Sequence, residues 1–141
     1  MSVDSGKCHC GQTEWEVKLN EKAHILCHCD TCKKLGGGAY SLNQIVPKEN
    51  LKVTKGGLKA YKYYGDSGKS VSCFYCPNCT SHVYHHQEVM GNDIVVRTIL
   101  LENGKNFQPG AEIYGKARLG WEKEVAQTFA TLPPPDPTPK L

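Results

Sequence analysis

Three cysteines within six positions constrain this chain more than any other feature of its sequence. Cys27, Cys29 and Cys32 are spaced so that a tight turn of the backbone can direct all three sulfur atoms to one point. The neighbouring sequence offers no fourth ligand at comparable spacing. A structural zinc ion usually takes four protein ligands, whereas a catalytic zinc ion takes about three and keeps one position for water or substrate. The spacing therefore predicts a zinc site with an open fourth position.

A second metal-binding motif lies later in the chain. Cys76 and Cys79 form a Cys-x-x-Cys turn, whose two sulfur atoms can reach one metal ion. Cys8 and Cys10 supply the remaining pair by elimination. Redox activity is the alternative for a Cys-x-x-Cys turn, but a thioredoxin-like site needs a helix after it, and residues 81–86 have the pattern of a strand. We therefore expect a closed zinc site.

The eight cysteines would also suit a secreted, disulfide-bonded protein. However, residues 1–6 lack the features of a signal peptide, and no apolar stretch reaches transmembrane length. We therefore expect a cytoplasmic protein that does not associate with membranes, in which clustered cysteines bind metals or catalyse. A chain of 141 residues can bury a core without disulfides, so we expect a single domain over residues 1–130.

Alternating apolar residues, separated by turn residues, predict a mainly β protein. The predicted strands cover residues 13–19, 39–46, 51–54, 58–64, 70–75, 81–86 and 93–101, with loop and strand over 109–119. Trp121, Val125 and Phe129 recur at helical spacing and predict one short C-terminal helix over residues 120–130. The proline-rich residues 131–141 are expected to form a disordered, extended tail.

These motifs together resemble the glutathione-dependent formaldehyde-activating enzyme (GFA) family, whose domain the centromere protein V proteins share. The resemblance covers about residues 6–129, and its motifs are the cysteines at 8–10 and 27–32, the Gly-Gly-Ala-Tyr sequence at 37–40, and the aromatic-Cys-x-x-Cys sequence at 75–79. It implies a β-tent fold of small antiparallel sheets around two zinc sites. It also implies a structural zinc on Cys8, Cys10, Cys76 and Cys79, and a catalytic zinc on Cys27, Cys29 and Cys32.

Family members with the named activity join formaldehyde to glutathione, giving S-hydroxymethylglutathione. This chain departs from the family at Thr80, where glycine is usual, in the segment 99–102, and at Glu112, where histidine is usual. These departures leave open another small electrophile or thiol adduct as the substrate, in a dedicated metabolic pathway. The centromere-related relatives also leave open a non-enzymatic zinc module that binds a partner.

The residues themselves favour thiol chemistry at the three-cysteine site. Three thiolates around Zn²⁺ give a formal charge of −1, which weakens the Lewis acidity of the metal but still suits a thiol ligand. We therefore predict a zinc-dependent carbon-sulfur lyase or synthase acting on a thiol adduct such as S-hydroxymethylglutathione. Cys27, Cys29 and Cys32 are the predicted catalytic residues.

Substrate contacts are expected next to this site. Lys33 and Lys34 could bind the carboxylates of glutathione, and the backbone amides of Gly37 and Gly38 could approach a ligand. Alternatively, the lysines are solvated and the glycines only turn the chain. Arg97 is either a pocket cation or, as we favour, an outward surface residue.

Two further residues bear on the open position, and the net charge bears on partners. His28 is expected to point away from the zinc, as a surface residue or as support for the ligands. Cys73 could close the second site, but strand alternation favours packing instead. The net charge of +3 comes from dispersed lysines and does not favour nucleic acid. A small-molecule thiol is the expected partner, and homo-oligomerisation stays open.

Overall fold

The computed structural model describes residues 2–134, and strands predominate within this range. The strands are β1 (Ser2–Lys7), β2 (Glu14–Leu19), β3 (Ala23–Cys27), β4 (Ser41–Pro47), β5 (Leu51–Lys55), β6 (Lys59–Tyr64), β7 (Ser70–Tyr75), β8 (His82–Gln87), β9 (Asp93–Arg97) and β10 (Gln108–Ile113). The helical elements are α1 (Asp30–Gly36) and the 3-10 turns η1 (Lys48–Asn50), η2 (Glu88–Met90), η3 (Thr98–Leu100), η4 (Gly104–Asn106) and η5 (Gly115–Ala117). The mainly β fold class is confirmed.

The described chain forms two units, and each is considered by itself. The first contains the described residues up to His24 together with Leu42–Gln108. The second contains Ile25–Ser41 and the described residues from Pro109 onward. The single-domain boundary at residue 130 stays a prediction, and most of the predicted tail lies outside the described residues. Within residues 2–134, no helix is both long and apolar enough to cross a membrane.

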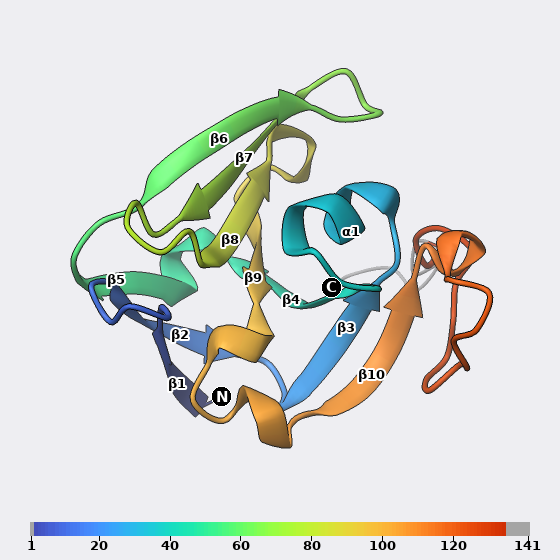
Figure 1. The fold of residues 1–141 in the computed structure, drawn as a ribbon, viewed down its shortest axis with the longest axis horizontal. Coiled ribbons are helices and arrows are strands. Elements are labelled where there is room, and N and C mark those ends of the chain that lie inside the picture. The colour runs from blue at the N-terminus through green and yellow to red at the C-terminus, as the bar shows by residue number, and fades with distance from the viewer. Residues whose placement is uncertain (1, 135–141) are drawn as a thin grey trace, which may run out of the picture. The chain divides into compact units, whose positions relative to one another are not determined.

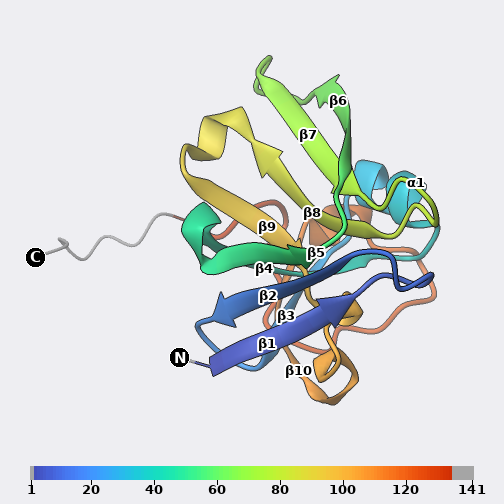
Figure 2. The same cartoon turned by 90° about the vertical axis from the view of Figure 1, so that its left-hand side faces the viewer.

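A three-stranded antiparallel sheet in the order β1-β2-β5 belongs to the first unit (Figure 2). The alternation of β2 determines its orientation, because Trp15, Val17 and Leu19 are buried while the residues between them are exposed. Gly6 of β1 lies opposite Trp15, and a Cβ atom at Gly6 would come within 2.2 Å of the indole ring. Only glycine fits at this point of β1.

The first unit also contains the antiparallel strands β4-β9-β8-β7-β6, in that order (Figure 1). The even-numbered residues of β9, Ile94 and Val96, are fully buried and belong to the same hydrophobic cluster as Trp15 and Val17 of β2. Burying side chains of this size contributes about 1.5–3 kcal/mol each. Because Val95 is also buried, β9 is covered on both faces, as expected for a central strand.

In the second unit, β10 lies next to β3, and the short helix α1 follows β3 directly. The cysteine spacing predicted only a tight turn in this segment, but the segment also contains the residues that begin and end a helix. The Cys29 side chain caps the N-terminus, Lys33 and Lys34 lie in the last turn, and Gly37 closes the C-terminus in the left-handed conformation with φ of 69°.

The predicted C-terminal helix is wrong. Residues 120–130 contain no helix, and Trp121 and Val125 are 75% and 57% exposed, so their helical spacing does not mark a buried face. The backbone amides of Val125 and Ala126 instead bond the Glu112 carboxylate, and Phe129 N donates to the Glu112 carbonyl. Because these tertiary bonds replace helical ones, the segment adopts an irregular course.

Candidate metal centres

The first unit brings four thiols together from two distant parts of the sequence. Cys8 and Cys10 follow β1, and Cys76 and Cys79 form the turn after β7. The Sγ atoms of all four lie within 4.8 Å of one another. Cys10 Sγ lies 3.6 Å from Cys8 Sγ and 3.7 Å from Cys76 Sγ, far longer than the roughly 2.05 Å of a disulfide. This group could hold a metal ion.

Hydrogen bonds orient the sulfur atoms of this group. Thr13 N donates to Cys8 Sγ at 3.3 Å, and the Ser81 hydroxyl lies 3.3 Å from Cys79 Sγ. The bonds to Cys79, led by the Ser81 hydroxyl, lower the pKa of that thiol to about 5, whereas burial raises the pKa of Cys8. The Cys79 thiol therefore loses its proton readily. A bound cation would favour the same loss at the buried Cys8 thiol.

Thr80, which stands where the resembling family usually has glycine, adopts a backbone conformation that favours glycine. It follows the Cys-x-x-Cys turn with φ of 68°, and its amide donates to the Cys76 carbonyl at 2.9 Å. Glycine adopts this left-handed conformation without strain, whereas a β-branched residue rarely does. The turn therefore keeps its geometry here at the expense of local strain.

The second unit brings together Cys27, Cys29 and Cys32, as the sequence predicts. Cys27 ends β3, Cys29 is the N-cap of α1, and Cys32 lies in the first turn of that helix. Their Sγ atoms lie within 4.8 Å of one another, and among the described residues no other cysteine, histidine or carboxylate belongs to this group. Cys32 N donates to Cys29 Sγ at 3.3 Å. Helix geometry therefore sets the spacing of two of the three sulfur atoms.

Crowding makes these three thiols difficult to ionise on their own. Hydrogen bonds shared with Cys29 and Cys32, followed by burial, raise the pKa of Cys27 far above its ordinary value. The pKa of Cys29 is also raised: the shared bond with Cys27 lowers it, but the bond with Cys32 and burial outweigh that effect. A cation at the centre of the group would offset the repulsion between thiolates, so a metal site accounts for the arrangement.

His28, between two of these thiols, is buried and not a surface residue. It is 1% exposed, and its Nε2 lies 2.7 Å from Glu112 Oε1. Its Nδ1 lies 3.5 Å from Glu122 Oε2 and makes no hydrogen bond, while the ring contacts Tyr40 at a centroid distance of 5.4 Å. His28 N also donates to the Ile113 carbonyl. These contacts attach the loop over residues 27–29, called the metal loop below, to β10.

Glu112 is the functional residue whose role the sequence did not show. It is completely buried, and besides His28 its carboxylate accepts bonds from Arg118 at 3.0 Å, Val125 N at 2.7 Å and Ala126 N at 3.1 Å. Burial alone would raise the pKa of Glu112, but the bonds from Val125, His28 and Arg118 lower it to about 2. Its one sequence signal is an acidic residue where the resembling family has histidine.

The predicted substrate contacts differ in their surroundings. The Lys33 ammonium already donates to Asp30 at 3.0 Å and to the Ala117 carbonyl at 2.5 Å, whereas Lys34 is exposed. Gly37 is the C-cap of α1, which favours the structural alternative for this residue, and Gly38 is exposed. Their role in binding a substrate stays a prediction.

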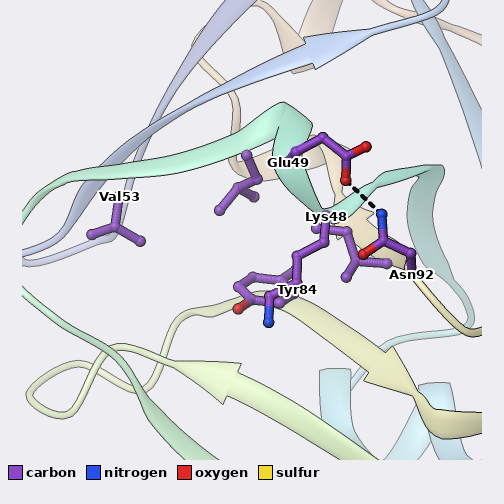
Figure 3. A pocket seen from close by; sticks show the side chains of 7 residues that line it. Lys48, Glu49, Val53, Tyr84 and Asn92 are labelled. Carbon is purple, nitrogen blue, oxygen red and sulfur yellow. Dashed lines mark hydrogen bonds between the residues drawn. The ribbon is translucent and has the colours of Figure 1, made fainter.

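Cys73 and one cavity of the first unit lie apart from its thiol group. Cys73 belongs to neither thiol group; it lies on β7, opposite Tyr61 and His85. A cavity of about 420 Å³ is separate from the first thiol group, and Glu49 at its edge is hydrogen-bonded to Asn92 (Figure 3). Its other lining residues are Lys48, Leu51, Val53, Tyr84 and Ile94.

Comparison with known proteins decides the family. The model of the family described as glutathione-dependent formaldehyde-activating enzyme matches residues 3–117. The chain belongs to this family. The GFA match includes both thiol groups and Glu112, so the resemblance seen in the cysteine motifs is confirmed.

Two fungal proteins and one bacterial structure illustrate how distant the relatives of this GFA protein are. A Podospora anserina protein, provisionally named as a member of the same family, is 27% identical over 92% of this chain and 68% of its own length. A Phaeosphaeria nodorum protein with the same provisional name is 33% identical, over 55% of this chain and 40% of its own length. A Rhodobacter sphaeroides crystal structure, 24% identical, has the same fold, with a TM-score of 0.57 over 70% of this chain and 87% of that protein.

Proposed function

We propose that this protein makes and breaks the carbon-sulfur bond of a thiol adduct, with S-hydroxymethylglutathione as the expected adduct and two zinc ions as cofactors. Family membership supports the pairing of formaldehyde with glutathione. The observation that carries the proposal is the group formed by Cys27, Cys29 and Cys32, which has no fourth protein ligand among the described residues. A closed structural site would need one.

The first thiol group fits a structural zinc. A tetrahedral ion with Zn–S bonds of about 2.3 Å separates its sulfur ligands by about 3.8 Å. The observed separations of 3.6 and 3.7 Å agree with this value. Cys8, Cys10, Cys76 and Cys79 would hold this ion, which would stabilise the first unit and take no part in the reaction.

Cys27, Cys29 and Cys32 would hold the second zinc, and its chemistry when bound is to favour loss of the proton from a thiol. In the overall reaction the thiol sulfur bonds to the aldehyde carbon, the carbonyl π bond breaks, and the proton of the thiol is balanced by that of the new hydroxyl group. The reverse reaction releases thiol and aldehyde. His28, held through Nε2 by Glu112, would keep the metal loop rigid in both directions of the reaction.

Exchange spectroscopy tests this function. Formaldehyde labelled with ¹³C also forms its glutathione adduct without a catalyst, and the proposal expects the zinc-loaded protein to accelerate this exchange above the uncatalysed rate. Cys29→Ala should abolish the acceleration and lose one zinc ion, whereas Cys73→Ala, outside both thiol groups, should retain both.

Rates equal to the uncatalysed exchange would exclude this function and favour the partner-binding zinc module. Acceleration with other aldehydes but not with formaldehyde would instead move the same chemistry to another electrophile.

A further inference from the structure

Arg97, the last residue of β9, is a buried cation, which corrects its prediction as an outward surface residue. Its side chain is 5% exposed. Nη1 donates to Oδ1 of Asn43 at 2.8 Å, and Asn43 lies directly opposite Arg97 on β4. Among the described residues, this amide is its one hydrogen-bond partner, and no carboxylate lies within 4.0 Å of the guanidinium. Arg97 is therefore a buried cation without a carboxylate partner among the described residues.

Such an arrangement is unfavourable for folding alone. Burying a charged group costs several kcal/mol unless an opposite charge and hydrogen bonds compensate it. The guanidinium carries five N–H donors, whereas Asn43 accepts one bond and brings no charge. Arg118, the other arginine of the chain, shows the usual solution, because it pairs with the carboxylate of Glu112 at 3.0 Å. Arg97 has no such carboxylate partner among the described residues.

The surrounding strand face supplies no such anion. Residues 93, 95 and 97 of β9 point to one side by alternation, opposite the side that carries Ile94 and Val96 of the core. The acidic member, Asp93, is exposed and lies four residues away, about 13 Å along the strand. Val95 lies opposite His85 on β8. The face therefore places no carboxylate next to the Arg97 guanidinium among the described residues.

We propose that Arg97 and Asn43 form a binding site for the carboxylate group of a small molecule. A guanidinium binds a carboxylate through two parallel N–H···O bonds, and the bond to Asn43 fixes the orientation of the donor fork. A single buried cation matches the single charge of a carboxylate better than the double charge of a phosphate. This inference concerns the first unit alone and holds independently of the proposed thiol chemistry.

Nuclear magnetic resonance of the arginine side chains tests the proposal. Because the chain has two arginines, its spectrum should contain two Nε–Hε signals, and Arg118 serves as an internal reference. Glutarate, a dicarboxylate without a thiol, should shift the Arg97 signal and leave the Arg118 signal unchanged. Reduced glutathione and its diethyl ester distinguish which molecule supplies the carboxylate. A shift by glutathione but not by the ester means that the site binds a carboxylate of glutathione. A shift by glutarate alone assigns the site to a separate small acid.

Substitutions provide the affinity test. Arg97→Gln should weaken glutarate binding about 10- to 100-fold, the loss expected for charge-assisted hydrogen bonds. Lys52→Gln removes the same charge from an exposed position of β5 and should bind glutarate as the wild type does.

Thermal unfolding separates this role from a structural one. Arg97→Met should melt at the wild-type temperature or above, because it removes a buried charge that has no ion-pair partner. The proposal is overturned if neither glutarate nor reduced glutathione shifts the Arg97 signal, or if Arg97→Met melts well below the wild type.

Discussion

At the scale of single residues, Glu112 illustrates how one buried carboxylate organises the second unit. It joins His28 of the metal loop to Arg118 and to the backbone of residues 125–126. These partners are donors that would lose their acceptor together if the carboxylate were removed. Residues 120–130 are therefore held by hydrogen bonds to Glu112 and not by the predicted helix. The same carboxylate connects this segment to the metal loop.

Glu112→Ala should destabilise the protein by about 3–5 kcal/mol, because it leaves Arg118 buried in part without its carboxylate and several amides without an acceptor. Glu124→Ala, in the same segment but exposed, should change the free energy of unfolding by less than about 0.5 kcal/mol. Urea unfolding measures both. Equal, small changes in the two variants would contradict the role of Glu112.

Glu112 should also make stability depend on pH. Its pKa in the folded protein is about 2, below the ordinary value of 4.5, so the contribution is complete above about pH 4.5 and declines as the pH falls toward 2. The difference in unfolding free energy between the wild type and Glu112→Gln should therefore shrink over this range. A difference that is constant from pH 6 to about pH 3 would exclude the proposed charge effect.

At the scale of elements, α1 couples helix capping to the second thiol group. Cys29 accepts the hydrogen bond of the N-cap, and Cys32 donates it from the first turn, so the helix positions two sulfur atoms. At the other end, Gly37 adopts the left-handed conformation and its amide bonds the Lys33 carbonyl at 2.8 Å. The integrity of this short helix is therefore expected to influence metal affinity.

Two adjacent glycines test the C-cap of α1. Gly37→Ala should cost about 1–2 kcal/mol, because alanine is strained at φ of 69° even though its Cβ would meet no neighbour within 4 Å. Gly36→Ala places the same methyl group in open space inside the helix and should be neutral or stabilise by up to about 1 kcal/mol. Unfolding in denaturant compares them, and the same sign for both would be inconsistent with the cap.

What the sequence could predict depended on how local each signal is. Metal-ligand spacing is local, so both thiol groups were found, and alternation located β7 with its observed bounds. The burial of Arg97 is not local, since alternation cannot show that both faces of β9 are covered. The caps of α1 were overlooked because a cysteine served as the N-cap, where serine or aspartate is the usual signal.

At the scale of the whole molecule, each unit has its own thiol group, so the two sites should respond separately to substitution. Cys79→Ser should remove the metal ion of the first unit, and because a structural zinc contributes on the order of 10 kcal/mol, the variant should lose its cooperative unfolding. Cys29→Ala should lose the other ion and remain folded. Metal content and thermal unfolding measure this, and a folded Cys79→Ser protein with two ions would refute the assignment.

The central claim is that the second metal ion keeps a position open for a thiol. ¹¹³Cd NMR of the cadmium-substituted protein tests it most directly, because the chemical shift of cadmium reports the number of bound sulfur atoms. We predict two signals, one from a site with four sulfur ligands and one from a site with three, and only the second should shift when reduced glutathione is added. Two four-sulfur signals that glutathione leaves unchanged would contradict the account.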